Sequence, residues 1–154
     1  MEDLRDIHYK RSRFSTRLLL DRVYTASHFW IQAHDAGVWR VGLTKFAGRM
    51  LGDVVDVGFG VTPGASVQLG DVIGWFEGFK ARSDLYSVVA GRFAGANPLL
   101  ETDVDVIDRD RYGAGWLYAV EGTPDPDARD APGYVQLLDE TIDRMRGHMP
   151  GRRG

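Results

Sequence analysis

Apolar residues in the middle of the chain alternate with polar ones over short runs, and this period of two favours β-strands. Two such runs lie at residues 29–33 and 38–41, and the sequence His34-Asp35-Ala36-Gly37 between them predicts a hairpin turn. The pattern therefore predicts a mainly β protein. Further strands are expected at residues 54–58, 72–76, 85–89, 91–94, 103–107 and 116–120.

Two segments depart from this alternation and predict helices. Thr44 is a suitable N-cap for a short helix over residues 45–50, and Gly52 is placed to end it. Residues 134–147 predict a C-terminal helix that packs on the β domain. Its apolar face, at helical spacing, consists of Tyr134, Leu137, Leu138, Ile142 and Met145.

The ends of the chain differ in composition from its middle. Residues 1–22 are rich in charge and predict an N-terminal arm with some helical character and weak organisation. The main domain is expected over residues 23–121. Residues 122–133 contain three prolines and predict a linker, and residues 148–154 predict a disordered tail.

A faint internal repeat indicates two similar halves. Gly60-Val61-Thr62-Pro63 resembles Gly95-Ala96-Asn97-Pro98, and Gly74-Trp75 resembles Gly115-Trp116. Two β halves related in this way would form a flattened sandwich with pseudo-twofold symmetry and one projecting hairpin.

Composition narrows the possible chemistry. The 154 residues include no cysteine, which excludes disulfides, Cys-based zinc sites and a thiol nucleophile, so any sulfur chemistry must come from an attached group. A net charge of −3 provides no overall basic field for nucleic acid or an anionic membrane. No apolar stretch approaches the roughly 20 residues of a membrane span, and the cytoplasm is the expected location.

Lysine is scarce, and one lysine occupies a distinctive place. The chain has only Lys10, Lys45 and Lys80. Lys80 is expected at the tip of a hairpin, between a strand that runs to Glu77 and another that starts near Ser83. A carrier lysine needs such a position, because a modifying enzyme must reach its amine. A solvated loop lysine without a special role is the simpler interpretation of the spacing alone.

Several blocks, in order, resemble the glycine cleavage system H protein family over about residues 23–146. The segment around the lysine matches the family pattern Lys-Ala-x-Ser-Asp-x-Tyr. The other blocks resemble the family's opening Tyr-Thr-x-x-His-x-Trp, its next two conserved stretches and its Tyr-Gly-x-Gly-Trp-Leu. The segment around the lysine is Lys80-Ala81-Arg82-Ser83-Asp84-Leu85-Tyr86, and the block that resembles the opening is Tyr24-Thr25-Ala26-Ser27-His28-Phe29-Trp30. The next two blocks are Val41-Gly42-Leu43-Thr44-Lys45-Phe46-Ala47 and Leu51-Gly52-Asp53-Val54-Val55. The last block is Tyr112-Gly113-Ala114-Gly115-Trp116-Leu117.

The resemblance implies a lipoyl/biotinyl-type fold, a flattened β-barrel or sandwich hybrid, with lipoate in amide linkage on Lys80. It implies a monomeric carrier that catalyses nothing itself and shuttles the aminomethyl group of glycine. The implied partners are glycine decarboxylase (P protein), aminomethyltransferase (T protein), dihydrolipoyl dehydrogenase (L protein) and a lipoyl ligase or transferase. The residues implied in recognition for lipoylation or in the groove for the arm are Glu77, Ala81, Asp84, Ser27, His28 and Phe29.

Some positions depart from the family pattern. Gly78-Phe79 stands where the family usually has Ser-Val; the glycine is expected to loosen the hairpin, and the phenylalanine adds apolar bulk beside Lys80. Phe29 stands where the family usually has a carboxylate thought to hold the amine of the loaded arm. A phenyl ring offers only a weaker cation–π contact, or else covers an edge of the core. The N-terminal arm is also longer than the family usually needs.

These departures keep other functions open. A divergent lipoyl carrier could serve another pathway, such as sulfur relay or lipoate transfer, and an unmodified interaction module could retain the fold alone. A biotin carrier fits less well, since Phe79 and Ala81 replace the methionines that flank a biotinylated lysine. A metal site is not favoured, because the histidines are scattered and the aspartates near residue 105 lack a calcium-loop pattern: His8, His28, His34, His148, Asp103, Asp105 and Asp108.

Overall fold

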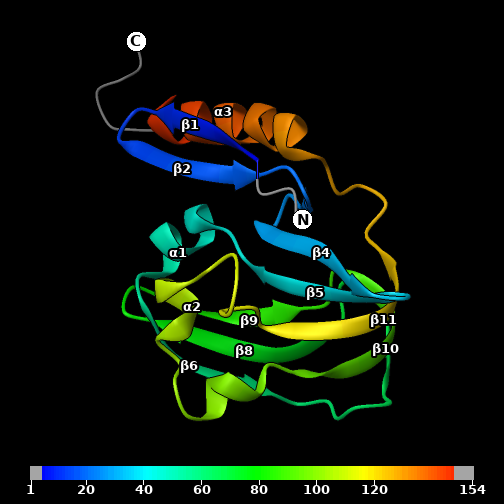
Figure 1. The fold of residues 1–154 in the computed structure, drawn as a ribbon. Helices are drawn as coiled ribbons and strands as arrows, with labels where there is room; N and C mark the ends of the chain where they lie inside the picture. The colour runs from blue at the N-terminus through cyan, green and yellow to red at the C-terminus, as the bar shows by residue number, and fades with distance from the viewer. Residues whose placement is uncertain (1–4, 148–154) are drawn as a thin grey trace.

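The computed structural model describes residues 5–147, which form three antiparallel β-sheets and three α-helices (Figure 1). The sheets have the strand orders β1-β2, β3-β4-β5-β11-β10-β7 and β6-β8-β9. The strands are β1 Asp6–Arg11, β2 Phe14–Leu19, β3 Val23–Tyr24, β4 Phe29–Asp35, β5 Val38–Leu43, β6 Val54–Phe59, β7 Ser66–Val67, β8 Val72–Gly78, β9 Arg82–Tyr86, β10 Val89–Ala96 and β11 Tyr118–Pro124. The helices are α1 Lys45–Leu51, α2 Val106–Arg109 and α3 Ala131–Gly147, with a 3₁₀ turn at Pro98–Glu101.

The main core lies between the six-stranded and three-stranded sheets. Phe29 of β4 and Phe76 of β8 stack across it, with ring centroids 6.3 Å apart and planes 11° apart. Both side chains are buried, as are Ile31 of β4 and Ile73 of β8 in the same core. The predicted fold class, mainly β with a short helix and a C-terminal helix, is confirmed, and the sheets stay open rather than closing into a barrel.

The first hairpin and the short helix form as the sequence predicts. Gly37 takes a φ of 73° in the turn between β4 and β5, a left-handed conformation that glycine adopts at little cost. The Thr44 hydroxyl accepts a hydrogen bond from Ala47 N and caps α1, and Gly52, with a φ of 76°, ends it.

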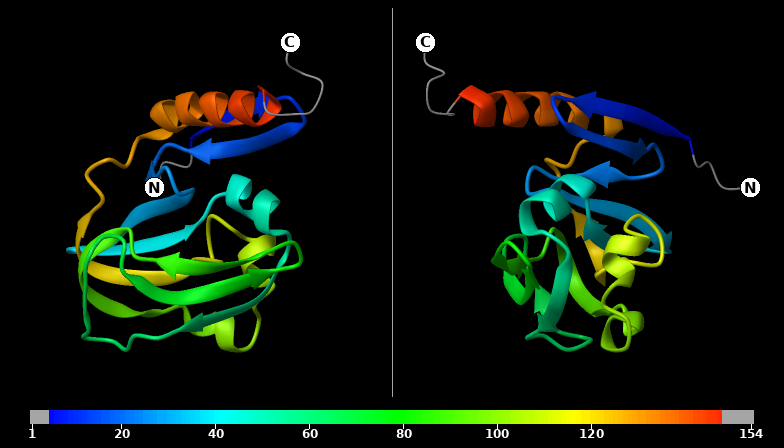
Figure 2. Two further views of the ribbon diagram at one scale, coloured as in Figure 1. Left: turned by 180° about the vertical axis from the view of Figure 1, so that it is seen from behind. Right: turned by 90° about the vertical axis from the view of Figure 1, so that its left-hand side faces the viewer.

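A second core joins the two ends of the chain. Strands β1 and β2 form a hairpin, and α3 lies across it (Figure 2). Tyr9, Phe14 and Leu18 of the hairpin pack with Tyr134 and Leu138 of the helix. The expected weak helical organisation of residues 1–22 is therefore wrong for the described part, residues 5–22, because alternate hairpin side chains are buried under α3.

Other element boundaries differ from the prediction. Residues 103–107 form turns leading into α2 rather than a strand, because Val106 and Ile107 are both buried as neighbours, and a strand would point them to opposite faces. The expected strand over residues 85–89 is split between β9 and β10, as the chain passes from one sheet to the other. Strand β11 runs into the predicted linker, and α3 begins three residues early. The predicted tail, residues 148–154, lies outside the described residues.

Candidate functional site

Lys80 lies in the tight turn between β8 and β9, against the C-terminal end of α1. Its backbone N–H donates to Leu51 O at 2.8 Å, and that of Phe79 donates to Asp53 O at 3.1 Å. The side-chain Nζ donates to Arg49 O at 3.0 Å. A helix ends with unpaired carbonyl groups and a partial negative charge, which suits an ammonium group. The hairpin tip is thus fixed by its backbone, while the amine stays exposed to solvent.

Gly78 allows this close approach between the hairpin and α1. A Cβ on Gly78 would overlap with Leu51 O, and one on Gly52 would lie 3.1 Å from Lys80 N. Gly78 is buried, and its N–H donates to Ala81 O at 2.8 Å across the turn. The expectation that Gly78 loosens the hairpin is therefore wrong, because the absence of a side chain at Gly78 allows the hairpin tip to pack against the end of α1.

Four of the predicted groove residues line one pocket of about 220 Å³ beside this hairpin. The β3–β4 turn supplies Ser27 and His28, β4 supplies Phe29, and β9 supplies Asp84. The remaining lining residues are Leu43, Ala47, Met50, Leu51, Phe76, Ser83 and Tyr86. Lys80 is four residues before Asp84, at most about 14 Å along an extended chain. The pocket is smaller than the roughly 300 Å³ at which sites for whole small molecules begin, so it suits the end of a flexible arm.

Phe29 forms part of the pocket and of the main core at the same time. Its side chain is 3 % exposed and stacks on Phe76, which also lines the pocket. Asp84 is the one acidic residue among the lining residues, and it lies at the exposed rim. The pocket thus combines an apolar base with a single carboxylate.

His28 is partly buried and takes an unusual backbone conformation. Its φ of 71° lies in the left-handed region, which is strained for a residue with a side chain. Burial lowers the pKa of His28 from its ordinary value of 6.5 to about 4, so the imidazole is neutral at pH 7. Its ring packs against that of Phe46 at a centroid distance of 4.7 Å.

A hydrogen-bonded chain connects His28 to two helices. The Tyr134 hydroxyl lies 2.8 Å from His28 Nδ1 and 3.0 Å from Thr44 Oγ1. Thr44 in turn caps α1, which carries the carbonyl that binds the Lys80 amine. The helical spacing predicts Tyr134 on the apolar face of its helix, but it does not indicate these hydrogen bonds of the Tyr134 hydroxyl. The only sequence signal for them is the phenol group itself, because a buried tyrosine hydroxyl needs a partner.

Glu77 and Ala81 flank Lys80 but do not line the pocket. Glu77 is the penultimate residue of β8 and pairs in register with Arg82 of β9, where its side chain is half-buried. Ala81 is exposed in the turn. The predicted site residues therefore form two groups, one around the amine and one around the pocket.

Comparison with known proteins identifies the family. The description "Glycine cleavage H-protein" applies to the family profile that matches residues 22–137. The chain belongs to the glycine cleavage H-protein family. Glycine cleavage system H proteins of Beutenbergia cavernae and Rubrobacter xylanophilus are 38 % and 40 % identical to it, over 76 % and 78 % of this chain and 93 % and 94 % of theirs. The crystal structure of a glycine cleavage system H protein from Mycobacterium marinum superposes with a TM-score of 0.71, at 35 % identity, covering 79 % of this chain and 99 % of that one.

The H-protein match leaves both ends of this chain uncovered. Residues 1–21 and 138–154 lie outside the matched range, and they include the β1–β2 hairpin and the second half of α3. The relatives are matched over nearly their whole length, whereas the same matches cover 76–79 % of this chain.

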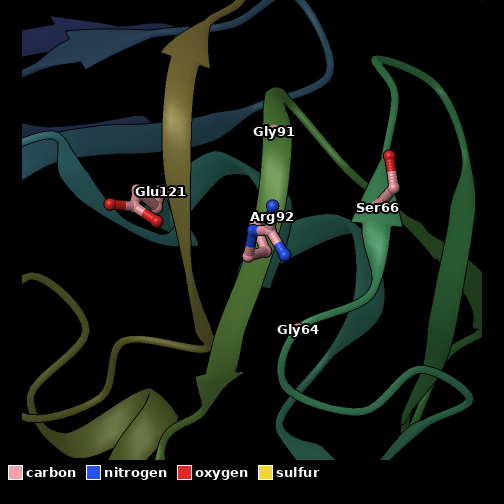
Figure 3. A pocket seen from close by; sticks show the side chains of 5 residues that line it. All are labelled: Gly64, Ser66, Gly91, Arg92 and Glu121. Atoms are coloured by element: carbon pink, nitrogen blue, oxygen red, sulfur yellow. The ribbon is translucent and has the colours of Figure 1, made fainter.

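Another hollow lies on the β domain, apart from Lys80. A shallow pocket near β7 is lined by Gly64, Ser66, Gly91, Arg92 and Glu121, and Figure 3 shows Arg92 between Glu121 and Ser66 on neighbouring strands. It shares no residue with the pocket beside Lys80. Between residues 5 and 147 no cluster of three or more His, Asp or Glu side chains could hold a metal ion. No helix in that range is long and apolar enough to cross a membrane.

Proposed function

We propose that this protein is a non-catalytic lipoyl carrier of the glycine cleavage system, with the lipoyl group in amide linkage on Lys80. The observation that carries the proposal is the place of Lys80: an exposed amine on a hairpin whose backbone is held by α1, next to an apolar pocket. Family membership supports the same assignment.

The residues around the pocket fit a lipoyl arm. Phe29, Leu43 and Phe76 offer apolar contact to a hydrocarbon chain and its dithiolane ring. The chain contains no cysteine, so no protein thiol can exchange with the arm's disulfide. When bound, lipoate supplies a disulfide that opens to accept the aminomethyl group of glycine.

The protein's own groups have separate roles in this proposal. Lys80 provides the amine for attachment, and the end of α1 keeps the hairpin tip in place for the attaching enzyme. Glu77 and Ala81 flank the lysine and are available for recognition by that enzyme. Asp84 is the carboxylate at the pocket that can pair with the cargo's amine, since Phe29 cannot. His28 is neutral and adds no positive charge that would repel an ammonium group.

The partners follow from the same proposal. Glycine decarboxylase loads the arm, aminomethyltransferase unloads it, dihydrolipoyl dehydrogenase reoxidises it, and a lipoyl ligase or transferase attaches it. A monomeric carrier in the cytoplasm stays the expectation from sequence.

Mass spectrometry tests the attachment. The protein is purified after coexpression with a lipoate ligase and lipoate, and the Lys80 peptide is compared with that of a Lys80→Arg variant. We expect a lipoyl mass increment on the Lys80 peptide that is absent from the variant. An unmodified Lys80 under these conditions would contradict the proposal.

A second candidate, a lipoyl carrier for another pathway, is favoured by one observation. Phe29 lines the pocket and stacks on Phe76, and its phenyl ring supplies no carboxylate for an aminated cargo at this position. Incubation of the lipoylated protein with glycine decarboxylase, glycine and pyridoxal phosphate separates the two. Loading of the arm supports glycine cleavage, whereas a lipoylated but unloaded protein supports the second candidate.

A further inference from the structure

Another pocket, of about 290 Å³, is lined by Phe46 and Arg49 of α1, whereas Ala47, Met50 and Leu51 of the same helix line the pocket beside Lys80. The β1–β2 turn, α1 and the last turns of α3 meet there, all on one side of the molecule (Figure 1). Seven of its nine lining residues lie outside the range matched by the H-protein family. The lining consists of Arg11, Ser12, Arg13, Phe14, Phe46, Arg49, Ile142, Met145 and Arg146.

The pocket has an apolar base. Phe14, Phe46 and Ile142 are buried, and the rings of the two phenylalanines meet edge to face at 5.3 Å. Met145 is 47 % exposed at the edge of the pocket. The base is therefore already formed and can receive one further apolar side chain without repacking.

The rim of the pocket carries unneutralised positive charge. Arg11 is paired with Asp139 and Asp143 of α3, and the charge of Arg146 also acts on Asp143, but in the described part of the chain Arg13 and Arg49 form no ion pair. The surrounding hairpin adds to this field: residues 5–19 contain five Lys or Arg and a single acid, Asp6, in a chain whose net charge is −3. Arg13 and Arg49 thus leave positive charge at the rim of this pocket.

Arg49 connects this pocket to the proposed attachment site. Its backbone carbonyl accepts the hydrogen bond from Lys80 Nζ, and its guanidinium donates to Arg13 O at 3.2 Å and lies 5.8 Å from the Phe14 ring. One residue of the pocket lining thus also accepts the hydrogen bond of the Lys80 amine. A protein that docks here is placed to act on the arm.

We propose that this pocket docks an enzyme that acts on the arm at Lys80, through an acidic segment of that enzyme that carries an apolar side chain. The inference rests on the proposed carrier function. Guanidinium groups pair with carboxylates in a fork geometry, and Arg, Met and aromatic residues are enriched at protein interfaces. A preformed apolar pocket ringed by charge is the arrangement in which one inserted side chain supplies much of the affinity.

The test measures binding without the arm. The full chain with Lys80→Arg is titrated against the same organism's lipoyl ligase, glycine decarboxylase, aminomethyltransferase and dihydrolipoyl dehydrogenase, each at several salt concentrations. Two pocket variants are added to this background, Arg13→Ser with Arg146→Ser, and Met145→Asp. The matched control removes the same charge elsewhere, with Arg17→Ser and Arg92→Ser.

For at least one enzyme, we expect both pocket variants to weaken binding by about tenfold or more at low salt, with a flatter salt dependence, while the control stays within about twofold. The inference is overturned if the pocket variants bind all four enzymes as the control does, or if the parent chain binds none of them. The lipoyl mass on Lys80 of the otherwise unchanged protein reports the carrier function separately, so the two failures are distinguishable.

Discussion

Nδ1 of His28 and the hydroxyl oxygen of Tyr134 lie 2.8 Å apart, although 106 residues separate them in the chain. The Tyr134 hydroxyl also contacts Thr44, whose oxygen accepts the N–H of Ala47. All these groups are satisfied if Thr44 donates to Tyr134 and Tyr134 donates to a neutral His28. One phenol group therefore joins α3, the cap of α1 and the wall of the pocket beside Lys80.

Replacing Tyr134 by phenylalanine removes this shared hydroxyl. We expect the free energy of unfolding to fall by about 1–3 kcal/mol, because the buried Thr44 hydroxyl and the partly buried His28 Nδ1 each lose a partner. Urea unfolding followed by circular dichroism measures the change. Tyr86→Phe is the matched control, since no hydrogen bond of the Tyr86 hydroxyl occurs in the described residues, and equal losses in the two variants would contradict the role of the network.

The partly buried His28 also predicts a pH dependence of stability. Burial lowers its pKa to about 4, whereas in the unfolded chain it is near 6.5, so below pH 6.5 the unfolded state takes up a proton that the folded state does not. The free energy of unfolding should fall by up to about 3 kcal/mol as the pH falls from 6.5 to 4. Above pH 7 the titration of His28 should not change it.

Unfolding measured at pH 7.5 and pH 4.5 isolates this contribution when the wild type is compared with His28→Asn. Asparagine tolerates the left-handed backbone of this position and does not titrate. We expect the difference in stability between the two pH values to be smaller in the variant. An identical pH dependence in both proteins would show that His28 is not the responsible group.

Most of the β domain could be predicted from the sequence because its signals are local. The turn at Gly37 and the cap at Thr44 each depend on neighbouring residues, and the structure confirms both. The N-terminal hairpin could not be predicted in this way. One face of the hairpin is buried only because α3 covers it, and α3 lies more than 100 residues away in the chain. The charged residues of the hairpin dominate its local pattern.

The candidate site could be predicted from the sequence only in part, because it too depends on contacts between segments far apart in the chain. The approach of Asp84 to His28 and Phe29 followed from the resemblance to a family whose fold brings these segments together. The role of Gly78 could not be found from the sequence, because the atom that excludes a side chain there, Leu51 O, belongs to a distant part of the chain. Tyr134 was missed because helical periodicity does not distinguish a buried phenol from any other apolar residue.

Gly78→Ala tests whether the hairpin tip must sit against α1. The added methyl group would overlap with Leu51 O, so we expect a loss of about 1–3 kcal/mol in stability and a slower lipoylation of Lys80. Chemical unfolding and time-resolved mass spectrometry measure the two effects. Gly60→Ala is the control, since a Cβ at Gly60 would meet nothing within 4 Å. Unchanged stability and lipoylation in Gly78→Ala would contradict the tight approach.

Ser12 offers a site for stabilising the N-terminal hairpin. Its φ of 57° in the two-residue turn between β1 and β2 is left-handed, a conformation that costs a residue with a side chain about 1–2 kcal/mol and glycine little. Ser12→Gly should raise the free energy of unfolding by about 0.5–1 kcal/mol after the larger entropy loss of glycine. Ser15→Gly, within β2, should lower it by a similar amount, and effects of the same sign would contradict the assignment of this turn.

Substitution of Phe79 should affect recognition by the lipoylating enzyme without affecting the stability of the fold. It is 79 % exposed, more than any other large apolar side chain in the described residues, and it directly precedes Lys80. Phe79→Ala should change the free energy of unfolding by less than about 0.5 kcal/mol, because little of the ring is buried. The kcat/KM of lipoylation should fall by about tenfold, since an exposed aromatic beside the target residue is a typical anchor for an enzyme. Leu99→Ala, exposed but distant in sequence, is the control, and equal rates in the two variants would leave Phe79 without a role in recognition.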